Sequence, residues 1–288
     1  MATVGYGSAA VKHPSRRDET LLARLGYRQE LKRAMGAFSS FAVSFSIISV
    51  LTGVVTTYAD ALASGGPGGL GLGWPLVATG TLTVALAMAE LASAFPTAGA
   101  LYHWSALLGG ARAGWVTAVM NLFGQFAITA AIDLGFAREC AGLVGGGPMM
   151  AMAILACVLV VHAIVNAASV RLVARLNDLS ATVHVVGVLL LVGALAFGGA
   201  HKPIAILADT SFTTRSDGRL TFGFLGALVL GMYTFTGYDA SAHLSEETHD
   251  PSRKAPRAIL ASVIVSAIAG YALLVALTLS IDADRFDR

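Results

Sequence analysis

The stretch FSSFAVSFSIISVLTGVVTT, residues Phe38–Thr57, contains no charged residue over a length that can cross a membrane. A transmembrane helix needs about 20 mostly apolar residues to span the ~30 Å hydrocarbon core of a bilayer. The middle of this stretch, SIISVLTG, nevertheless contains Ser46, Ser49, Thr52 and Gly53, residue types that bend or weaken a helix. The sequence therefore predicts a membrane helix that is interrupted near its centre.

Six further stretches along the chain have the same character, although one of them contains a glutamate. Of the 288 residues, 56% are hydrophobic and only 12% are charged, whereas about 25% are charged in an ordinary soluble domain. We therefore expect an all-α polytopic membrane protein with seven spans. The further stretches are Trp74–Phe95 (which contains Glu90), Trp115–Ile132, Pro148–Val170, Leu179–Ala200, Thr221–Tyr238 and Ala258–Ile281.

The basic residues predict how these spans are oriented. If the N-terminus is cytoplasmic, the inner segments contain most of the 19 lysines and arginines, as the positive-inside rule requires. We expect a multi-pass protein of the plasma membrane with a cytoplasmic N-terminus and an external C-terminus. The high alanine and arginine content is consistent with a GC-rich bacterial genome, and so with a bacterial inner membrane. No cleaved signal peptide is apparent, because the first ~35 residues lack an apolar core.

The segments between the spans are short and predict no soluble domain. Residues 1–35 form a cytoplasmic N-terminal segment, in which Asp18–Ala34 reads either as an amphipathic helix on the inner leaflet or as a solvated leader. The glycine-rich linker Ser64–Gly73 is expected to be a flexible external loop, and Phe95–Gly114 a cytoplasmic connection.

A second interruption lies in the sixth span, at YTFTGYD, residues Tyr233–Asp239. At a rise of 1.5 Å per residue, this break and the one in the first span both lie roughly 16–18 Å deep, from opposite surfaces. Broken helices at matching places in two inverted halves mark the binding site of many transporters. The alternative is that serine and threonine merely bend these helices and that glycine marks close packing.

The chemistry of the two breaks suggests a ligand. The half-helix after Gly53 directs its free N–H groups and positive dipole end toward the midplane, which favours a carboxylate. The half-helix that ends near Tyr233 offers free carbonyl groups, which suit an ammonium group. We therefore expect a small zwitterionic substrate, with a coupling proton or cation, and no cofactor, metal or nucleic acid. Cys140 and Cys157 are interpreted as apolar fillers.

Three motifs carry a resemblance to a known family. They are ELASAFPTAGALYHW (Glu90–Trp104), the first-span run SFSIISVLTG, and FTGYDASAHLSEETHDPSRKAPRAI (Phe235–Ile259). Together they resemble the amino acid–polyamine–organocation (APC) superfamily of permeases, and within it the amino acid/choline branch that includes GABA permeases. The similarity extends over nearly the whole chain.

The resemblance implies a LeuT-like fold, in which a five-plus-five inverted repeat is usually followed by two more spans. Residues 36–200 would then be the first repeat, with spans 1–5, and residues 201–288 the start of the second, with spans 6 and 7. About seven of an expected twelve spans are present. We therefore interpret the chain as a C-terminally truncated permease that does not transport when it is expressed alone.

The resemblance also implies secondary active transport, by alternating access, of an amino acid or a related amine such as GABA, choline or a polyamine. Family permeases bind their substrate with the unwound parts of the first and sixth spans. The SVLTG segment departs from the GSG pattern of better-known relatives, which puts the carboxylate contact in doubt. The substrate-binding residues carried over in this way are Ser49, Val50, Leu51, Thr52, Gly53, Tyr233, Phe235, Thr236, Gly237 and Asp239.

Ionisable residues inside the spans are functional candidates, because a charge in the bilayer interior is costly. The candidates for proton coupling or gating are Asp239, His184 and Glu90. Asp239 could be a proton-linked gate or contact a substrate amine, or it could be a structural hydrogen-bond acceptor. His184 could relay protons, or could bond to a neighbouring helix. Glu90 is expected to act in helix packing or an inner gate, and Asp133 to be solvated or to cap its helix.

Two other functions were weighed. A seven-span receptor has the right number of helices, but the predicted orientation argues against the G-protein-coupled type, and Ala258–Ile281 contains no lysine to hold retinal. A membrane-embedded enzyme would need converging catalytic or metal-binding groups, yet the chain contains no HExxH motif and its histidines are scattered. We therefore predict a transporter with no catalytic residues.

Overall fold

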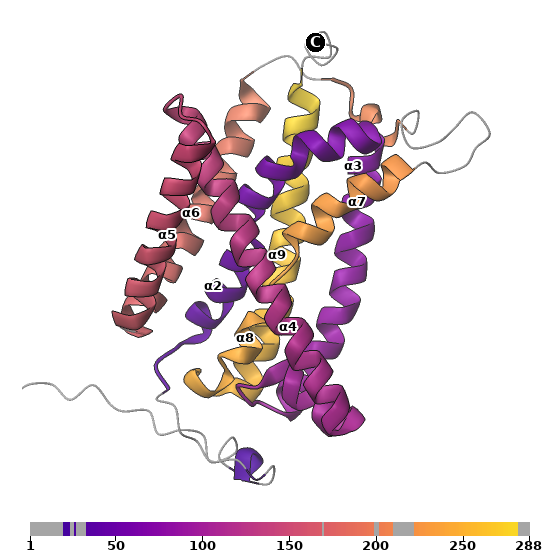
Figure 1. The fold of residues 1–288 in the computed structure, drawn as a ribbon. Coiled ribbons are helices and arrows are strands. Elements are labelled where there is room, and N and C mark those ends of the chain that lie inside the picture. Colours follow the sequence, from indigo (N-terminus) through magenta and orange to yellow (C-terminus); the bar gives the residue numbers. More distant parts are fainter. Residues whose placement is uncertain are drawn as a thin grey trace, which may run out of the picture.

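The computed structural model describes residues 20–23, 26, 33–168, 170–198, 202–209 and 222–281, and their fold is all-α, as predicted. No strand occurs among these residues, only a single bridge between Met35 and Thr248. Most of the N-terminal segment 1–35, including nearly all of the helix expected at Asp18–Ala34, lies outside them. The helices (Figure 1) are α2 (Ala37–Ile48), α3 (Val50–Ala94), α4 (Ala100–Leu143), α5 (Pro148–Ala168), α6 (Val170–Phe197), η1 (Ile204–Ala208), α7 (Phe222–Thr234), α8 (Ala240–His243), η2 (Ser245–Glu247) and α9 (Pro251–Ser280).

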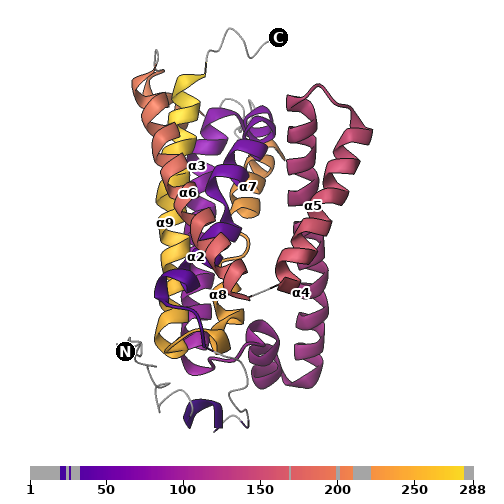
Figure 2. The same cartoon turned by 90° about the vertical axis from the view of Figure 1, so that its left-hand side faces the viewer.

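The described helices account for the seven predicted spans. Five segments are long and apolar enough to cross a membrane, and the first of them, Ala37–Ala94, is 58 residues long. This segment contains two spans, because Gly66 has φ 62° and ψ −175° and reverses the helix there. The remaining span, the sixth along the chain, is the shorter apolar helix α7 together with the segment that follows it. The chain is thus a multi-pass membrane protein in which α2 begins and α9 ends at opposite ends of the bundle (Figure 2).

The prediction of a flexible loop at Ser64–Gly73 is wrong. These residues belong to α3, and most of their glycines are buried. A Cβ added at Gly65 would lie 2.6 Å from Cβ of Ala227 on α7, and one added at Gly68 would collide with the Asp209 carbonyl next to η1. The glycines therefore allow backbones to pack against each other at the turn between spans 1 and 2, a role that small residues commonly have in membrane helices.

The expected connection Phe95–Gly114 is itself mostly helical. Helix α4 begins at Ala100 and reverses at Gly110, where φ is 80° and ψ is 175°. Nε1 of the buried Trp104 donates a hydrogen bond to the Phe95 carbonyl at 3.0 Å. This bond holds the short helix that precedes the third span against the end of α3.

The packed core lies among α2, α3, α6, α7 and α9, whereas α4 and α5 form a separate pair. Helix α3 packs against α7 and α9, and α2 packs against α9 and α6. Figure 2 shows α4 and α5 on the far side of the molecule from α6 and α9. Asp133 of α4 is 5% exposed and its Oδ2 lies 3.6 Å from Nδ1 of His162 on α5. The expectation that Asp133 is solvated or caps its helix is therefore wrong, because Asp133 lies inside α4 and is buried beside α5.

Candidate functional site

The predicted interruption of the first span is present at Ser49. This residue separates α2 from α3 and adopts a left-handed conformation, with φ 46° and ψ 59°, which is unfavourable for any residue with a Cβ. Its N–H still donates to the Phe45 carbonyl at 3.2 Å, and its own carbonyl accepts from the Gly53 N–H at 2.7 Å. The break is therefore confined to one residue, and a helical hydrogen bond between residues four apart is kept on each side of it.

The predicted interruption of the sixth span is longer. Helix α7 ends at Thr234, and α8 begins at Ala240. Gly237, in the turn between them, has φ 91°, a value that glycine adopts without a steric cost. The Thr236 N–H bonds to the Tyr233 carbonyl at 3.3 Å, and the Ala240 N–H to the Gly237 carbonyl at 3.1 Å. The chain thus makes two tight turns before it becomes helical again.

The two interruptions lie against each other, and each does so through a glycine. A Cβ added at Gly53 would lie 2.8 Å from Oγ1 of Thr234, at the end of α7. A Cβ added at Gly237 would collide with the side chain of Ile47, two residues before the break in the first span. Glycine is therefore required on both sides for the two broken helices to approach this closely.

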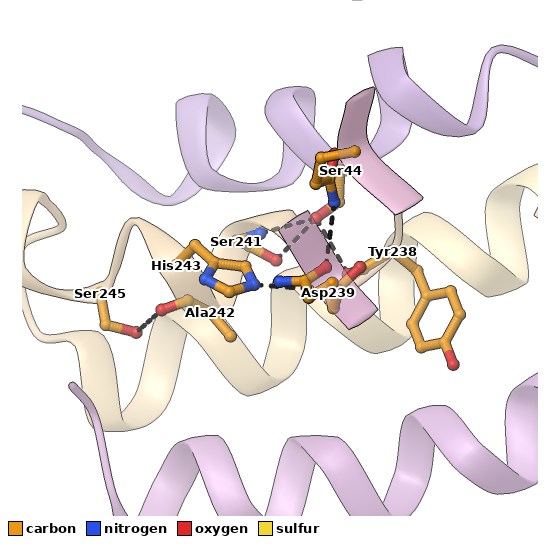
Figure 3. Close-up of polar contacts among 9 residues, drawn as sticks. Ser44, Tyr238, Asp239, Ser241, Ala242, His243 and Ser245 are labelled. Atoms are coloured by element: carbon orange, nitrogen blue, oxygen red, sulfur yellow. Dashed lines mark hydrogen bonds and ion pairs between the residues drawn. The ribbon is translucent and has the colours of Figure 1, made fainter. Parts of the chain in front are cut away.

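Polar contacts join α2, which precedes the first break, to the segment that follows the second break (Figure 3). Oγ of the buried Ser44, on α2, lies 3.0 Å from the Tyr238 carbonyl and 2.8 Å from Oγ of Ser241. The Ser241 N–H donates to the same Ser44 oxygen at 2.9 Å. A single serine of α2 thus satisfies backbone groups at the start of α8 that have no partner within that helix.

Asp239 is paired with a histidine one turn further along. Its Oδ2 lies 3.4 Å from Nε2 of His243, and its side chain is only 14% exposed (Figure 3). Asp239 therefore lies beside the break, as the sequence placed it, but faces an intramolecular cation when His243 is protonated. The sequence analysis did not pair it with His243, although a spacing of four residues places two side chains on the same side of a helix.

His184 contacts the break in the first span from a different helix. Nε2 of His184, on α6, accepts a hydrogen bond from the Leu51 N–H at 2.8 Å, and the imidazole packs edge-on against Phe45. The first N–H groups of a helix have no partner within it, and Leu51 lies in the first turn of α3. The N–H of Leu51, a residue that was predicted to bind substrate, is therefore already bonded to His184.

A cavity of about 530 Å³ lies between the two breaks and α4. This volume is within the range of small-molecule sites, roughly 300–1,000 Å³. Ile47, Thr236 and Gly237 line it from the broken helices. The opposite wall is one face of α4, and its polar members are Thr117, Asn121 and Gln125.

This wall of the cavity was not among the predicted site residues. Thr117, Asn121 and Gln125 are spaced four residues apart within an otherwise apolar span, so they lie on one helix face. Asn121 and Gln125 are the only residues with amide side chains in the third span, Trp115–Ile132, so the pattern could have been found in the sequence. In the structure, Nε2 of Gln125 lies 3.4 Å from Oδ1 of Asn121.

Of the ten residues that were predicted to bind substrate, only Thr236 and Gly237 line the cavity. Val50 is buried in the hydrophobic core, and Phe235 packs on Trp74 with ring centroids 4.9 Å apart, away from the cavity lining. Tyr233 is half-buried. Glu90 has an exposed side chain near the end of α3, and no hydrogen bond or ion pair joins it to either break within the described part of the chain.

The chain is similar to known permeases over nearly its whole length. The family model described as "Amino acid permease" matches residues 35–285. The amino-acid permease BAT1 of Arabidopsis thaliana is 37% identical over 279 residues, which is 90% of this chain and 54% of that protein. Its homolog from Oryza sativa subsp. japonica has the same identity and coverage.

One yeast relative is named for a specific substrate. The GABA-specific permease of Saccharomyces cerevisiae is 31% identical over 287 residues, covering 93% of this chain and 50% of that protein. The chain therefore spans about half the length of the curated relatives it matches.

Proposed function

Because this chain belongs to the amino acid permease family, we propose that it forms the substrate-binding part of a secondary active transporter for an amino acid or a related amine. The matched relatives are permeases and not enzymes. Alternating access would then expose the cavity between the broken helices first to one side of the membrane and then to the other.

The observation that carries this proposal is the cavity lined by the second break, by Ile47 beside the first break, and by α4. Backbone that leaves its helix inside a bilayer is tolerated where protein buries it or where it lines a cavity. Here Thr236 and Gly237 of the second break and Ile47 beside the first line one cavity, opposite the polar side chains of Asn121 and Gln125. A small polar solute fits such a site better than a lipid or an ion alone.

The polar groups around the cavity favour a zwitterion. The amides of Asn121 and Gln125 can both donate and accept hydrogen bonds, so they suit a carboxylate or an ammonium group. The C-terminal end of α7, where the helix dipole is negative, lies directly before the turn at Thr236 and Gly237 that lines the cavity, which favours the amine. Amino acids, GABA, choline and polyamines are the substrates to test, and the GABA-specific relative makes GABA one of the first.

His184 is our candidate for proton coupling. Its neutral Nε2 accepts the Leu51 N–H at 2.8 Å, and a protonated imidazole cannot accept that bond. Protonation would therefore release the first turn of α3 at the break. Among the described residues no acidic or basic side chain forms an ion pair with His184. Asp239, already beside His243, is the second candidate.

We further propose that the N-terminus is cytoplasmic and that the protein resides in the plasma membrane, as a bacterial inner-membrane protein. The distribution of its basic residues supports this orientation. The end of the bundle where α2 and α9 begin would face the cytoplasm.

Ligand binding to the purified protein, in the longest form that its gene encodes, tests the proposed function. The melting temperature would be measured with a panel of amino acids, GABA, choline and polyamines. At least one solute should raise it, and Asn121→Leu should weaken that solute's binding by about tenfold or more, because a buried polar group of the ligand loses its partner.

Asn166→Leu provides the matched control. Asn166 is an exposed asparagine of α5 whose side chain bonds to the carbonyl of His162 within its own helix. This variant should bind the solute as the parent does. A panel without any stabilising solute, or an equal loss in both variants, would contradict the proposed site.

A further inference from the structure

A second cavity, of about 320 Å³, lies at the end of the bundle where α2 and α9 begin. Its floor is apolar and is formed by Ala37 and Phe41 of α2 and by Ala258 and Ala261 of α9. Its rim is charged and is formed by the first turns of α9. We call this cavity the basic groove; its rim residues are Asp250, Arg253, Lys254 and Arg257.

The backbone fixes the two walls of the basic groove relative to each other. Met35, just before α2, pairs with the segment before α9: its N–H donates to the Glu247 carbonyl at 2.9 Å, and its carbonyl accepts from the His249 N–H at 3.0 Å. The chain before α2 is therefore held against the chain before α9, and the groove between the two helices is a built feature.

Among the described residues, the rim of the basic groove carries a net positive charge. Three basic side chains face one carboxylate, that of Asp250. No ion pair joins Arg253, Lys254 or Arg257 to an acidic residue within the part of the chain that the structure describes. Arg253 and Arg257 are exposed, so both guanidinium groups can reach a ligand above the floor.

The position of the basic groove along α9 matches the boundary between lipid headgroups and hydrocarbon. The uncharged part of α9 starts at Ala258, immediately after Arg257. Arg253 and Arg257 lie one turn apart, about 6 Å along the helix, and Ala261 lies one turn deeper. A ligand that fills the groove would therefore meet cations at headgroup level and an apolar floor below them.

We propose that the basic groove binds an anionic phospholipid of the cytoplasmic leaflet, with the phosphate between Arg253 and Arg257 and the upper acyl chain against Phe41 and Ala261. Guanidinium groups bind phosphate with two parallel hydrogen bonds, and basic clusters at the membrane surface attract anionic lipids. The apolar floor selects a lipid over a free phosphate. The choice of leaflet rests on the orientation given under the proposed function, whereas the lipid chemistry does not.

Bound phospholipid would add a further connection between the starts of α2 and α9, which already pack against each other and are joined through the Met35 backbone. Because α2 leads directly to the break at Ser49, a lipid in the basic groove would stabilise the arm of the broken span nearest the cytoplasm. The lipid should therefore raise the thermal stability of the protein.

The test measures melting temperature and lipid binding of the full-length protein in nanodiscs of phosphatidylcholine alone or with phosphatidylglycerol added. Arg253→Gln/Arg257→Gln should lose most of the stabilisation by phosphatidylglycerol, with about tenfold weaker binding. Arg112→Gln/Arg175→Gln removes the same charge from exposed positions outside the groove, on α4 and α6, and should behave as the parent does. Equal losses in the two double variants would overturn the proposal in favour of diffuse attraction.

Two further measurements separate the possible ligands. Ala261→Phe fills the floor and keeps every cation, so it should also weaken phosphatidylglycerol binding. Inorganic phosphate should not replace the lipid; if it stabilises the protein equally, the groove is a free-anion site and the lipid proposal fails. Solute binding by the parent protein is measured in parallel. If the parent binds a solute but is not stabilised by phosphatidylglycerol, this proposal alone is rejected. If phosphatidylglycerol stabilises the parent but no solute binds, the proposed function alone is rejected.

Discussion

Gly237 is the residue on which the contact between the two broken helices most depends. Its φ of 91° is strained for any residue with a side chain, and a Cβ would collide with Ile47. Gly237→Ala should therefore destabilise the protein by at least about 1–3 kcal/mol, the cost of one strained backbone conformation, and should weaken substrate binding. The measurement is a melting curve of the purified variant.

Gly80→Ala is the control for this substitution. Gly80 lies within α3 with ordinary helical geometry, and a Cβ there meets nothing within 4 Å. Alanine is favoured over glycine in a helix, so this variant should keep or raise the melting temperature. If the two alanine variants were equally stable, the close approach of the broken helices would not be needed for the fold.

The second prediction at residue scale concerns His184 and pH. Imidazole changes charge between about pH 5 and pH 8, and only its neutral form can accept the Leu51 N–H. Uptake by the full-length protein should therefore vary with pH over this range. In His184→Gln, which keeps a neutral acceptor, the pH profile should flatten while substrate binding persists. An unchanged profile would exclude His184 from coupling.

At this scale the sequence predicted the places of the breaks but not the contacts within them. Serine, threonine and glycine in an apolar span already indicate an interruption, and Ser49 and Gly237 lie where that reasoning placed them. The partner of Leu51 is His184, 133 residues away, which no local pattern identifies. Phe235 was assigned to the substrate, but it packs on Trp74, because the sequence does not tell which side of a turn faces the cavity.

At the scale of elements, α2 and α8 are the two half-helices whose contact defines the site. Ser44 and Ser241 have Oγ atoms 2.8 Å apart. The two cysteines of the chain are first replaced by Cys140→Ser/Cys157→Ser. In this background, Ser44→Cys/Ser241→Cys should form a disulfide on mild oxidation. The disulfide is detected by gel electrophoresis after the chain is cleaved between positions 44 and 241, because the two fragments then stay linked. The crosslink should also block substrate exchange, because alternating access requires these elements to move.

A second pair of cysteines controls for random collision. Ser39 lies on the same helix as Ser44, but its Oγ contacts Asp178 of α6 at 3.1 Å. Ser39→Cys/Ser241→Cys should remain reduced under the same conditions. Equal crosslinking of both pairs would show that α2 does not hold a fixed register against α8.

The glycine-rich run after the first span shows where reasoning about elements failed. Glycine clusters usually mark flexible connections in soluble proteins, and Ser64–Gly73 was interpreted in that way. In this membrane bundle the same glycines are buried, since Gly65 and Gly68 let α7 and the end of η1 approach the backbone. Thr117, Asn121 and Gln125 of α4 were not predicted to line a site. The cavity that they line forms only where the two broken helices lie opposite α4, and no local sequence pattern shows that arrangement.

At the scale of the whole molecule, the seven spans place η1 and the start of α4 at opposite membrane surfaces. Ala208, in η1, and Leu108, just before the reversal at Gly110, are both exposed. In the cysteine-free background and in intact cells, Ala208→Cys should react with a membrane-impermeant thiol reagent and Leu108→Cys should not. The opposite pattern would reverse the proposed orientation.

The central claim is that substrate binds where the two broken helices face α4, and protection of a single cysteine tests it most directly. In the full-length, cysteine-free protein, Thr236→Cys lines the cavity and Ala208→Cys lies outside it. The account predicts that the solute which stabilises the protein slows thiol modification at Thr236→Cys and leaves the rate at Ala208→Cys unchanged. Modification of Thr236→Cys at the same rate with saturating solute as without it would contradict the account.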